Sequence, residues 1–143
     1  MFRRSLATLL LGSTAVLVSG SITGAAGGVP TKTIAAVTSV DYRAVVTARK
    51  SSSGSAPAAT VTVTTYTPDK GRWALARDRR LPETYFWKTV TAPRALCRLE
   101  ISTAGVATGR GPRLIVQLLL SPALGCGRTF SVALVGTASR AAA

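Results

Sequence analysis

The sequence predicts an all-β protein, and two observations support this prediction. After residue 34, apolar and polar side chains alternate with a period of two, which is typical of strands that bury one face. Prolines fall between the alternating segments, where a missing backbone N–H breaks no strand pairing. We therefore expect about seven antiparallel strands in an immunoglobulin-like β-sandwich, with a small β-barrel as the alternative.

A segment that precedes this domain has the order of a secretory leader. Arg3 and Arg4 begin it, the apolar run 6–18 follows, and mostly small residues occupy 19–26, as signal peptidase requires. The run is shorter than the roughly 20 residues that a membrane-spanning helix takes. We predict a helical signal peptide over 1–26, with Sec export, or twin-arginine export as the alternative. The protein is then secreted and carries no transmembrane anchor.

The remaining chain has the length of one domain. We expect a flexible segment over 27–34, a single β-sandwich domain over 35–138 and a disordered tail over 139–143. The predicted strands are 35–49, 59–67, 71–77, 84–90, 95–102, 113–120 and 128–136.

The first strands are predicted from alternation and from one turn. Over 41–49, a row of mostly small apolar side chains alternates with a more polar row that holds two arginines. Over 60–66, threonines alternate with Val61 and Val63. The segment 67–71 contains Pro, Asp and Gly, which favour a turn into the third strand.

Two later strands differ in the number of faces that they bury. In 84–90, Tyr85 and Trp87 share one face and Phe86 lies on the other, so at least one aromatic row belongs to the core. The segment 114–120 is apolar at nearly every position, which predicts a strand that is covered on both faces.

The charge of the chain favours anionic partners. The full sequence has 18 basic and 5 acidic residues and a net charge of +13, and loss of Arg3 and Arg4 with the leader lowers this to +11. Basic exported proteins meet anionic wall polymers, headgroups or acidic proteins. We expect an anionic cell-wall polymer or an acidic protein as the partner, and we do not expect nucleic acid. Biased composition in a GC-rich genome is the alternative explanation, but it does not account for the shortage of acids.

Two short segments are candidates for binding. The candidate anion-binding residues are Lys70, Arg72, Arg77, Arg79 and Arg80, because guanidinium groups bind phosphates and carboxylates in a bidentate manner. We expect Trp73 and Leu75 to face the core and 77–80 to form a turn. The alternative is a solvated edge strand that its charges protect from aggregation. Trp73 and Tyr85 are candidate aromatic contacts for a sugar or a partner protein.

The cysteines predict a disulfide, and the residue types argue against catalysis. Cys97 and Cys126 are the two cysteines, and we expect one bond between them, with Cys97 on an apolar strand face. Because the chain has no histidine, the usual activation of a serine or cysteine nucleophile is excluded. We expect no enzyme, no metal and no cofactor. A hydrolase that pairs Asp69 with Asp78, or Asp78 with Glu83, is the catalytic alternative.

Three stretches carry a resemblance to a known group of proteins. Gly-Arg-Trp at 71–73, Tyr-Phe-Trp at 85–87 and the segment 118–126 resemble small exported proteins of actinomycetes, a group with no assigned activity. The resemblance extends over about 70–130 and implies secretion from a Gram-positive bacterium. A second function hypothesis is a protein-binding or inhibitor-like module that uses an exposed edge strand or the glycine-containing loop 103–112.

Overall fold

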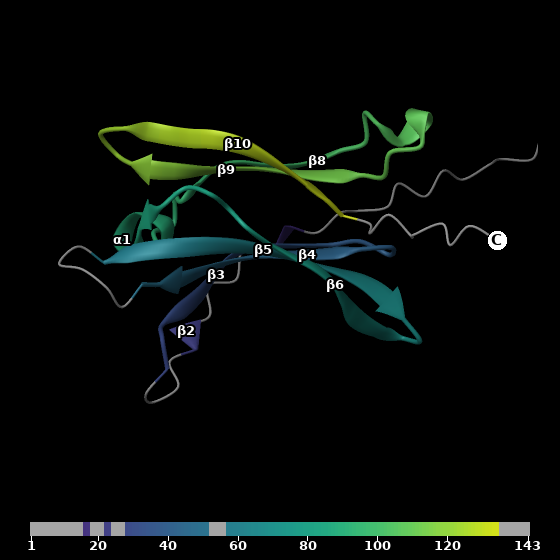
Figure 1. Ribbon diagram of the computed structural model, residues 1–143, viewed down its shortest axis with the longest axis horizontal. Helices are drawn as coiled ribbons and strands as arrows, with labels where there is room; N and C mark the ends of the chain where they lie inside the picture. The colour runs from purple at the N-terminus through teal and green to yellow at the C-terminus, as the bar shows by residue number, and fades with distance from the viewer. Residues whose placement is uncertain (1–15, 18–21, 24–27, 52–56, 135–143) are drawn as a thin grey trace, which may run out of the picture.

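The computed structural model describes residues 16–17, 22–23, 28–51 and 57–134, and these residues form an all-β protein (Figure 1). The strands are β1 (Val16–Leu17), β2 (Ile22–Thr23), β3 (Thr31–Thr38), β4 (Arg43–Lys50), β5 (Ala58–Asp69), β6 (Arg72–Arg80), β7 (Tyr85–Phe86), β8 (Leu96–Ser102), β9 (Arg113–Ser121) and β10 (Gly125–Ala133). The helices are the short α1 (Trp87–Val90) and the 3-10 helix η1 (Val106–Thr108). The all-β prediction is therefore confirmed.

The strands form two antiparallel sheets. The larger sheet has the order β1-β3-β4-β5-β6, with β2 also paired to β3 and β7 also paired to β5. The smaller sheet has the order β10-β9-β8. From β3 to β6 and from β8 to β10, each strand pairs with its successor in the chain. This order differs from that of immunoglobulin domains, in which each sheet combines strands from distant parts of the chain.

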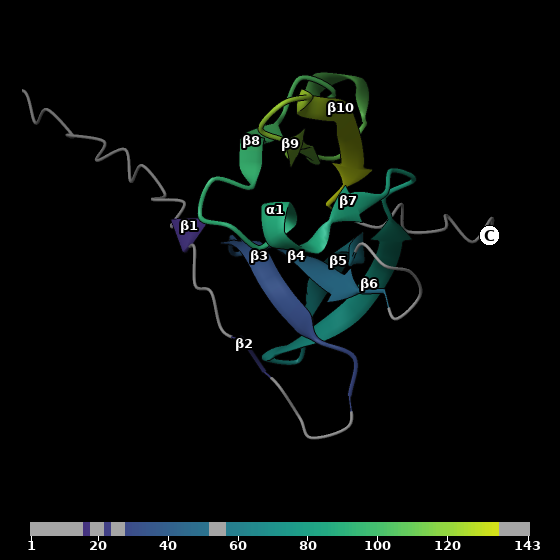
Figure 2. The ribbon, with the colours of Figure 1, turned by 90° about the vertical axis from the view of Figure 1, so that its left-hand side faces the viewer.

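The two sheets lie as two layers with one core between them (Figure 1). Val46, Val61 and Val63 are fully buried on the inner face of the larger sheet, and Leu114 and Val116 are fully buried on the inner face of the smaller one. Burial of each such side chain stabilises the fold by about 1.5–3 kcal/mol. Figure 2 shows α1 between the layers at one end. The alternation of apolar and polar residues thus identified the core faces.

The first predicted strand is in fact two strands. β3 ends at Thr38, a turn closed by the Ser39 N–H and the Tyr42 carbonyl (2.8 Å) follows, and β4 then runs back. Because β3 begins at residue 31, the prediction of a flexible 27–34 is wrong for its second half. The cause is a bulge between Thr33 and Ala35, which buries two successive residues and removes the period of two.

The strand predicted over 84–90 is also wrong beyond its first residues. β7 contains two residues, and α1 begins at Trp87. Tyr85 is 1% exposed, Phe86 is 50% exposed, and Trp87 packs against the core while partly buried. A single helical turn is too short to display a 3.6-residue period, so the alternation appears to continue through it.

The predicted leader is described at four residues, and these are extended. β1 pairs antiparallel with Val37 and Ala36 of β3, and β2 pairs antiparallel with Lys32 and Thr31 of the same strand. A helix is therefore wrong for these four residues, because the edge of β3 supplies their backbone with hydrogen-bond partners. The rest of 1–26 and the tail 139–143 lie outside the described residues. Of the helices in the described ranges, none has the length and hydrophobicity needed to cross a membrane.

Candidate functional site

The predicted basic segment forms β6 and the tight turn that precedes it. Lys70 and Gly71 connect β5 to β6, with φ angles of 48° and 78°. Two successive residues with positive φ form the type I′ turn, whose twist matches that of a β-hairpin. Glycine adopts this conformation without strain, and Lys70 adopts it as an exposed residue at the tip.

The arginines of this segment lie in a strand and not in the turn that we expected. Arg77 and Arg79 are paired with Thr65 and Val63, whose side chains are buried on the inner face, while Arg80 lies on the outer face. The side chains of all three arginines are exposed, although those of Arg77 and Arg79 lie on the inner side of the sheet. In the described part of the chain β6 is an edge strand of the larger sheet, and this position leaves both of its faces open to solvent.

The cations of β6 form no ion pair within the described residues, although Asp69 lies opposite Arg72 and Asp78 shares a strand face with Arg80. Within the described residues, the ion pair joins Arg98 to Glu100 on β8, in the other sheet. Asp78 lies between Arg77 and Arg79 in sequence, but side chains of successive strand residues point to opposite faces. The guanidinium groups of β6 are therefore available to bind an anion.

The candidate aromatic contacts have different surroundings. Trp73 is partly buried near the tip, where it lines a hollow together with Asp69, Lys70, Arg72 and Ala74. Leu75, which we expected in the core, is 62% exposed because a register shift reverses the faces of β6 before Arg77. Tyr85 is buried, so it is not a surface contact, and that prediction is wrong.

The outer face of the larger sheet adds polar and basic groups beside β6 that sequence analysis had not assigned to a site. The register aligns one outward residue from each of β3 to β6: Thr33, Thr47, Thr62 and Arg80. Arg43 and Arg49 lie on the same face of β4, and the Arg43 guanidinium lies 5.8 Å from the centre of the Tyr66 ring. The alternation of threonine at residues 60–64 is the sequence feature that indicates this face.

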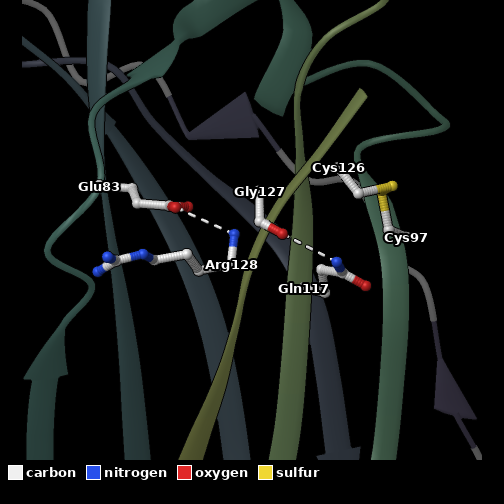
Figure 3. The surroundings of a disulfide bond; sticks show 6 residues. All are labelled: Glu83, Cys97, Gln117, Cys126, Gly127 and Arg128. Atoms are coloured by element: carbon white, nitrogen blue, oxygen red, sulfur yellow. Dashed lines mark hydrogen bonds between the residues drawn. A yellow bond between two sulfur atoms is a disulfide. The ribbon is translucent and has the colours of Figure 1, made fainter. Parts of the chain in front are cut away.

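Cys97 and Cys126 form the predicted disulfide, with Cα atoms 6.1 Å apart (Figure 3). It joins β8 to β10, the two strands that flank β9. Both cysteines are exposed, so the expectation that Cys97 lies on an apolar face is wrong. A register shift between Leu96 and Arg98 is the reason, because it lets Leu96 and Leu99 pack against the core and turns Cys97 outward.

Glu83, in the segment between β6 and β7, reaches Arg128 of β10 and so connects the two sheets (Figure 3). Its Oε2 accepts a hydrogen bond from the Tyr85 hydroxyl (2.9 Å), and its Oε1 accepts one from the Arg128 backbone N–H (3.0 Å). A Cβ atom at Gly127 would lie 2.5 Å from Glu83 Oε2, so glycine is needed for this approach. We call Glu83, Tyr85, Gly127 and Arg128 the Glu83 cluster.

The Glu83 cluster satisfies polar groups that the strands leave unpaired. β10 has a register shift between Cys126 and Thr129, which removes two residues from regular pairing with β9. The Arg128 backbone N–H donates a hydrogen bond to Glu83, and the Gly127 carbonyl accepts one from Gln117 Nε2 at 2.8 Å. Burial, together with the hydrogen bond to Glu83, raises the pKa of the Tyr85 hydroxyl well above its usual value.

The carboxylates are not arranged as a catalytic pair. Asp78 lies opposite Thr64, and the five residue steps along β5 from Thr64 to Asp69 correspond to roughly 16 Å. The two carboxyl groups of glycosidases lie within about 10 Å of each other. Glu83 is held in the Glu83 cluster, away from Asp78. Among the described residues, His, Cys, Asp and Glu form no group of three that could hold a metal ion.

Comparison with known proteins assigns no family to the chain. No protein-family model, no curated protein and no solved structure matches it. The resemblance to exported actinomycete proteins therefore stays a prediction from the sequence.

Proposed function

We propose that the chain is exported, loses residues 1–26 and acts as a non-catalytic domain that binds an anionic polymer of the cell envelope. The observation that carries this proposal is the set of exposed arginines on β6, which form no ion pair within the described residues. The disulfide supports export, because such bonds persist in oxidising compartments outside the cytoplasm. The net charge favours the same class of partner.

The basic surface runs along the edge of the larger sheet: Lys70 and Arg72 lie at the turn, Arg77 and Arg79 on the inner side of β6, and Arg80 on its outer face, where Arg43 and Arg49 of β4 also lie. Alternate residues of a strand are spaced by roughly 6.6 Å, so the long arginine side chains reach successive anionic groups of a polymer. The threonine hydroxyls of the outer face supply hydrogen-bond donors and acceptors for sugar or polyol hydroxyls.

We also propose that the two sheets form a β-sandwich. One core receives side chains from both sheets, which supports face-to-face packing. The strands β6, β8 and β10 each pair on one side within the described residues, whereas a closed barrel has no such outer strands.

Salt-dependent retention on a polyanion tests the proposed function. The variant with Arg77, Arg79 and Arg80 replaced by Ser is compared with wild type on immobilised heparin and on purified anionic wall polymer, over a salt gradient. We expect the variant to elute at clearly lower salt, because each lost contact reduces the number of counterions that binding releases.

The matched control removes the same charge elsewhere. Lys88, Arg94 and Arg110 are exposed cations outside the basic surface, and their replacement by Ser lowers the net charge equally. We expect this control to elute close to wild type. Equal losses in the two variants would show that net charge alone retains the protein and would overturn the assignment to β6. Retention that does not respond to salt would instead indicate a partner protein with an apolar interface.

A further inference from the structure

The outer edge of β3 accepts added strands. β4 pairs with one edge of β3, and the opposite edge pairs with β1 at Val37 and Ala36 and with β2 at Lys32 and Thr31. Figure 2 shows β1 and β2 beside β3, on the side of the molecule away from β7. The backbone of β3 can therefore bind extended segments in an antiparallel direction.

A pocket adjoins the middle of this edge. It has a volume of about 400 Å³ and is mostly apolar, and its lining comes from β3 and from the segment between α1 and β8. The lining residues are Lys32, Thr33, Ile34, Val90, Thr91, Ala92, Pro93, Ala95 and Leu96. We call this cavity the β3 pocket. Of its β3 residues, Lys32 is paired with β2, and Thr33 and Ile34 lie between the pairing positions of β2 and those of β1, so edge and pocket form one continuous surface.

Removal of the leader, on which this inference rests, frees that surface. β1 and β2 both lie within 1–26, so the mature chain lacks the two strands that occupy the edge. The described core extends from Ile34 to Leu134, so a chain that begins at Gly27 keeps it. Mature protein would present unpaired backbone groups next to an apolar cavity.

We propose that the edge of β3 and the β3 pocket form a strand-addition site for an extended, apolar, non-basic segment of another polypeptide. The partner's backbone pairs antiparallel with β3, and one apolar side chain enters the pocket. Main-chain hydrogen bonds supply affinity in this mode, and the pocket supplies selectivity for the inserted side chain. β1 and β2 pair with this edge until the leader is cleaved.

The details of the edge favour a flexible segment over a second copy of this chain. The bulge between Thr33 and Ala35 interrupts β3, and Lys32 places a charge on its inner side. Bulges and inward charges are features that prevent rigid sheets from pairing edge to edge. A flexible segment can pair on both sides of the bulge, as β1 and β2 do.

A peptide that copies the leader tests the site. The probe is a synthetic peptide with residues 14–25 of this chain, extended by two aspartates for solubility, added to mature protein of residues 27–143. We expect saturable binding of one peptide per chain, slower amide hydrogen exchange in β3, and NMR shift changes at Val90 and Ala92. The full-length chain should bind the probe on the order of tenfold more weakly, because its own leader competes.

Two matched controls separate strand addition from general adhesion. A peptide with proline in place of Val16, Leu17, Ile22 and Thr23 has no backbone N–H at any of the four paired positions, so we expect it not to bind. Ala92→Phe fills the β3 pocket and should weaken binding on the order of tenfold, whereas Ala123→Phe, in the exposed turn before β10, should leave it unchanged.

Equal binding of the proline peptide, or shift changes away from β3, would overturn the proposal. If the mature protein formed dimers in the absence of peptide, the partner at the edge of β3 would be a second copy of this chain and not a segment of another polypeptide. Failure of the strand-addition site is distinguishable from failure of the proposed function. N-terminal sequencing of the exported protein tests leader removal. Elution of Ala92→Phe from heparin tests polymer binding separately. We expect that elution to match wild type.

Discussion

The two long sides of the molecule, where the edges of the two sheets approach each other, are closed in different ways. On one side Glu83, in the segment between β6 and β7, accepts a hydrogen bond from the Arg128 backbone N–H of β10, and the buried Tyr85 hydroxyl holds the same carboxylate in place. On the other side the β3 pocket remains between β3 and the start of β8, bridged by the Lys32 Nζ, which donates to the Thr91 carbonyl. The difference indicates that one side stabilises the fold, while the other retains space for a ligand.

The two sides differ in the free energy of unfolding that is lost when one contact is removed. Tyr85 is almost fully buried, so loss of its acceptor leaves a hydroxyl without a partner, at a cost of about 1–3 kcal/mol. Lys32 and Thr91 are partly exposed beside a cavity, where water can replace the lost hydrogen bond. The predictions below test this comparison, in order of decreasing expected effect.

Loss of the disulfide should have the largest effect, because it ties β8 on the pocket side to β10 on the Glu83 side. Replacement of Cys97 and Cys126 by Ser opens a loop with a sequence separation of 29 residues, and we expect a loss of about 3–4 kcal/mol in the free energy of unfolding. Urea unfolding followed by tryptophan fluorescence measures it. Wild-type protein in reducing agent serves as the control and should unfold like the variant. A loss below about 1 kcal/mol would show that the sheets do not need this link.

Gly127→Ala should destabilise the Glu83 side by about 2 kcal/mol, because the added Cβ displaces the carboxylate from Tyr85 and Arg128. Glu83→Ala makes room for this Cβ, so the same alanine should cost less in that background. Unfolding of both single variants and of the double variant gives the coupling energy. Additive losses would show that the glycine serves some contact other than Glu83.

These two predictions also separate what the sequence specifies from what it does not. Alternation specified the faces of β5, and the presence of two cysteines in a domain predicted to be exported specified the disulfide. β9, which we expected to be covered on both faces, buries one row of side chains and leaves the other row partly exposed. The bulges in β3, β6 and β8 were not predictable, because each depends on pairing with a neighbouring strand. The bulge in β3 concealed the start of that strand, and the bulges in β6 and β8 moved Leu75 and Cys97 to another face.

The candidate site likewise contains features that the sequence specifies and features that it does not. Local composition identified the cations of β6, but their position on an outer strand follows from the sheet order. Glu83 was considered only as a member of a carboxylate pair, because the hydrogen bond to Arg128 spans 45 residues of sequence. The buried position of Tyr85 likewise depends on the second sheet, which alternation within 84–90 does not describe.

Tyr85→Phe should lower the free energy of unfolding by about 1 kcal/mol, because it deletes the hydroxyl and leaves Glu83 bonded to Arg128. The pKa of Tyr85 is raised in the folded state, so folding favours the neutral phenol. The contribution of the Tyr85 hydroxyl to the free energy of unfolding is complete below the unfolded pKa of about 10 and declines as the pH rises above that value. Wild type should therefore lose more stability than Tyr85→Phe between pH 9 and pH 11, values chosen to bracket about 10. Parallel pH profiles would contradict the role of the hydroxyl.

Lys32→Met should have the smallest effect, below about 1 kcal/mol, because it removes one hydrogen bond at the rim of a cavity and keeps the apolar part of the side chain. Tyr85→Phe is the matched comparison, since each variant deletes one side-chain hydrogen-bond donor, on one side of the molecule in Lys32→Met and on the other in Tyr85→Phe. Urea unfolding of both variants under the same conditions gives the two losses. A loss for Lys32→Met that equals or exceeds the loss for Tyr85→Phe would show that the pocket side is held as firmly as the Glu83 side. The β3 pocket would then be part of the closed core, and a partner segment could enter it only by breaking contacts that the fold needs.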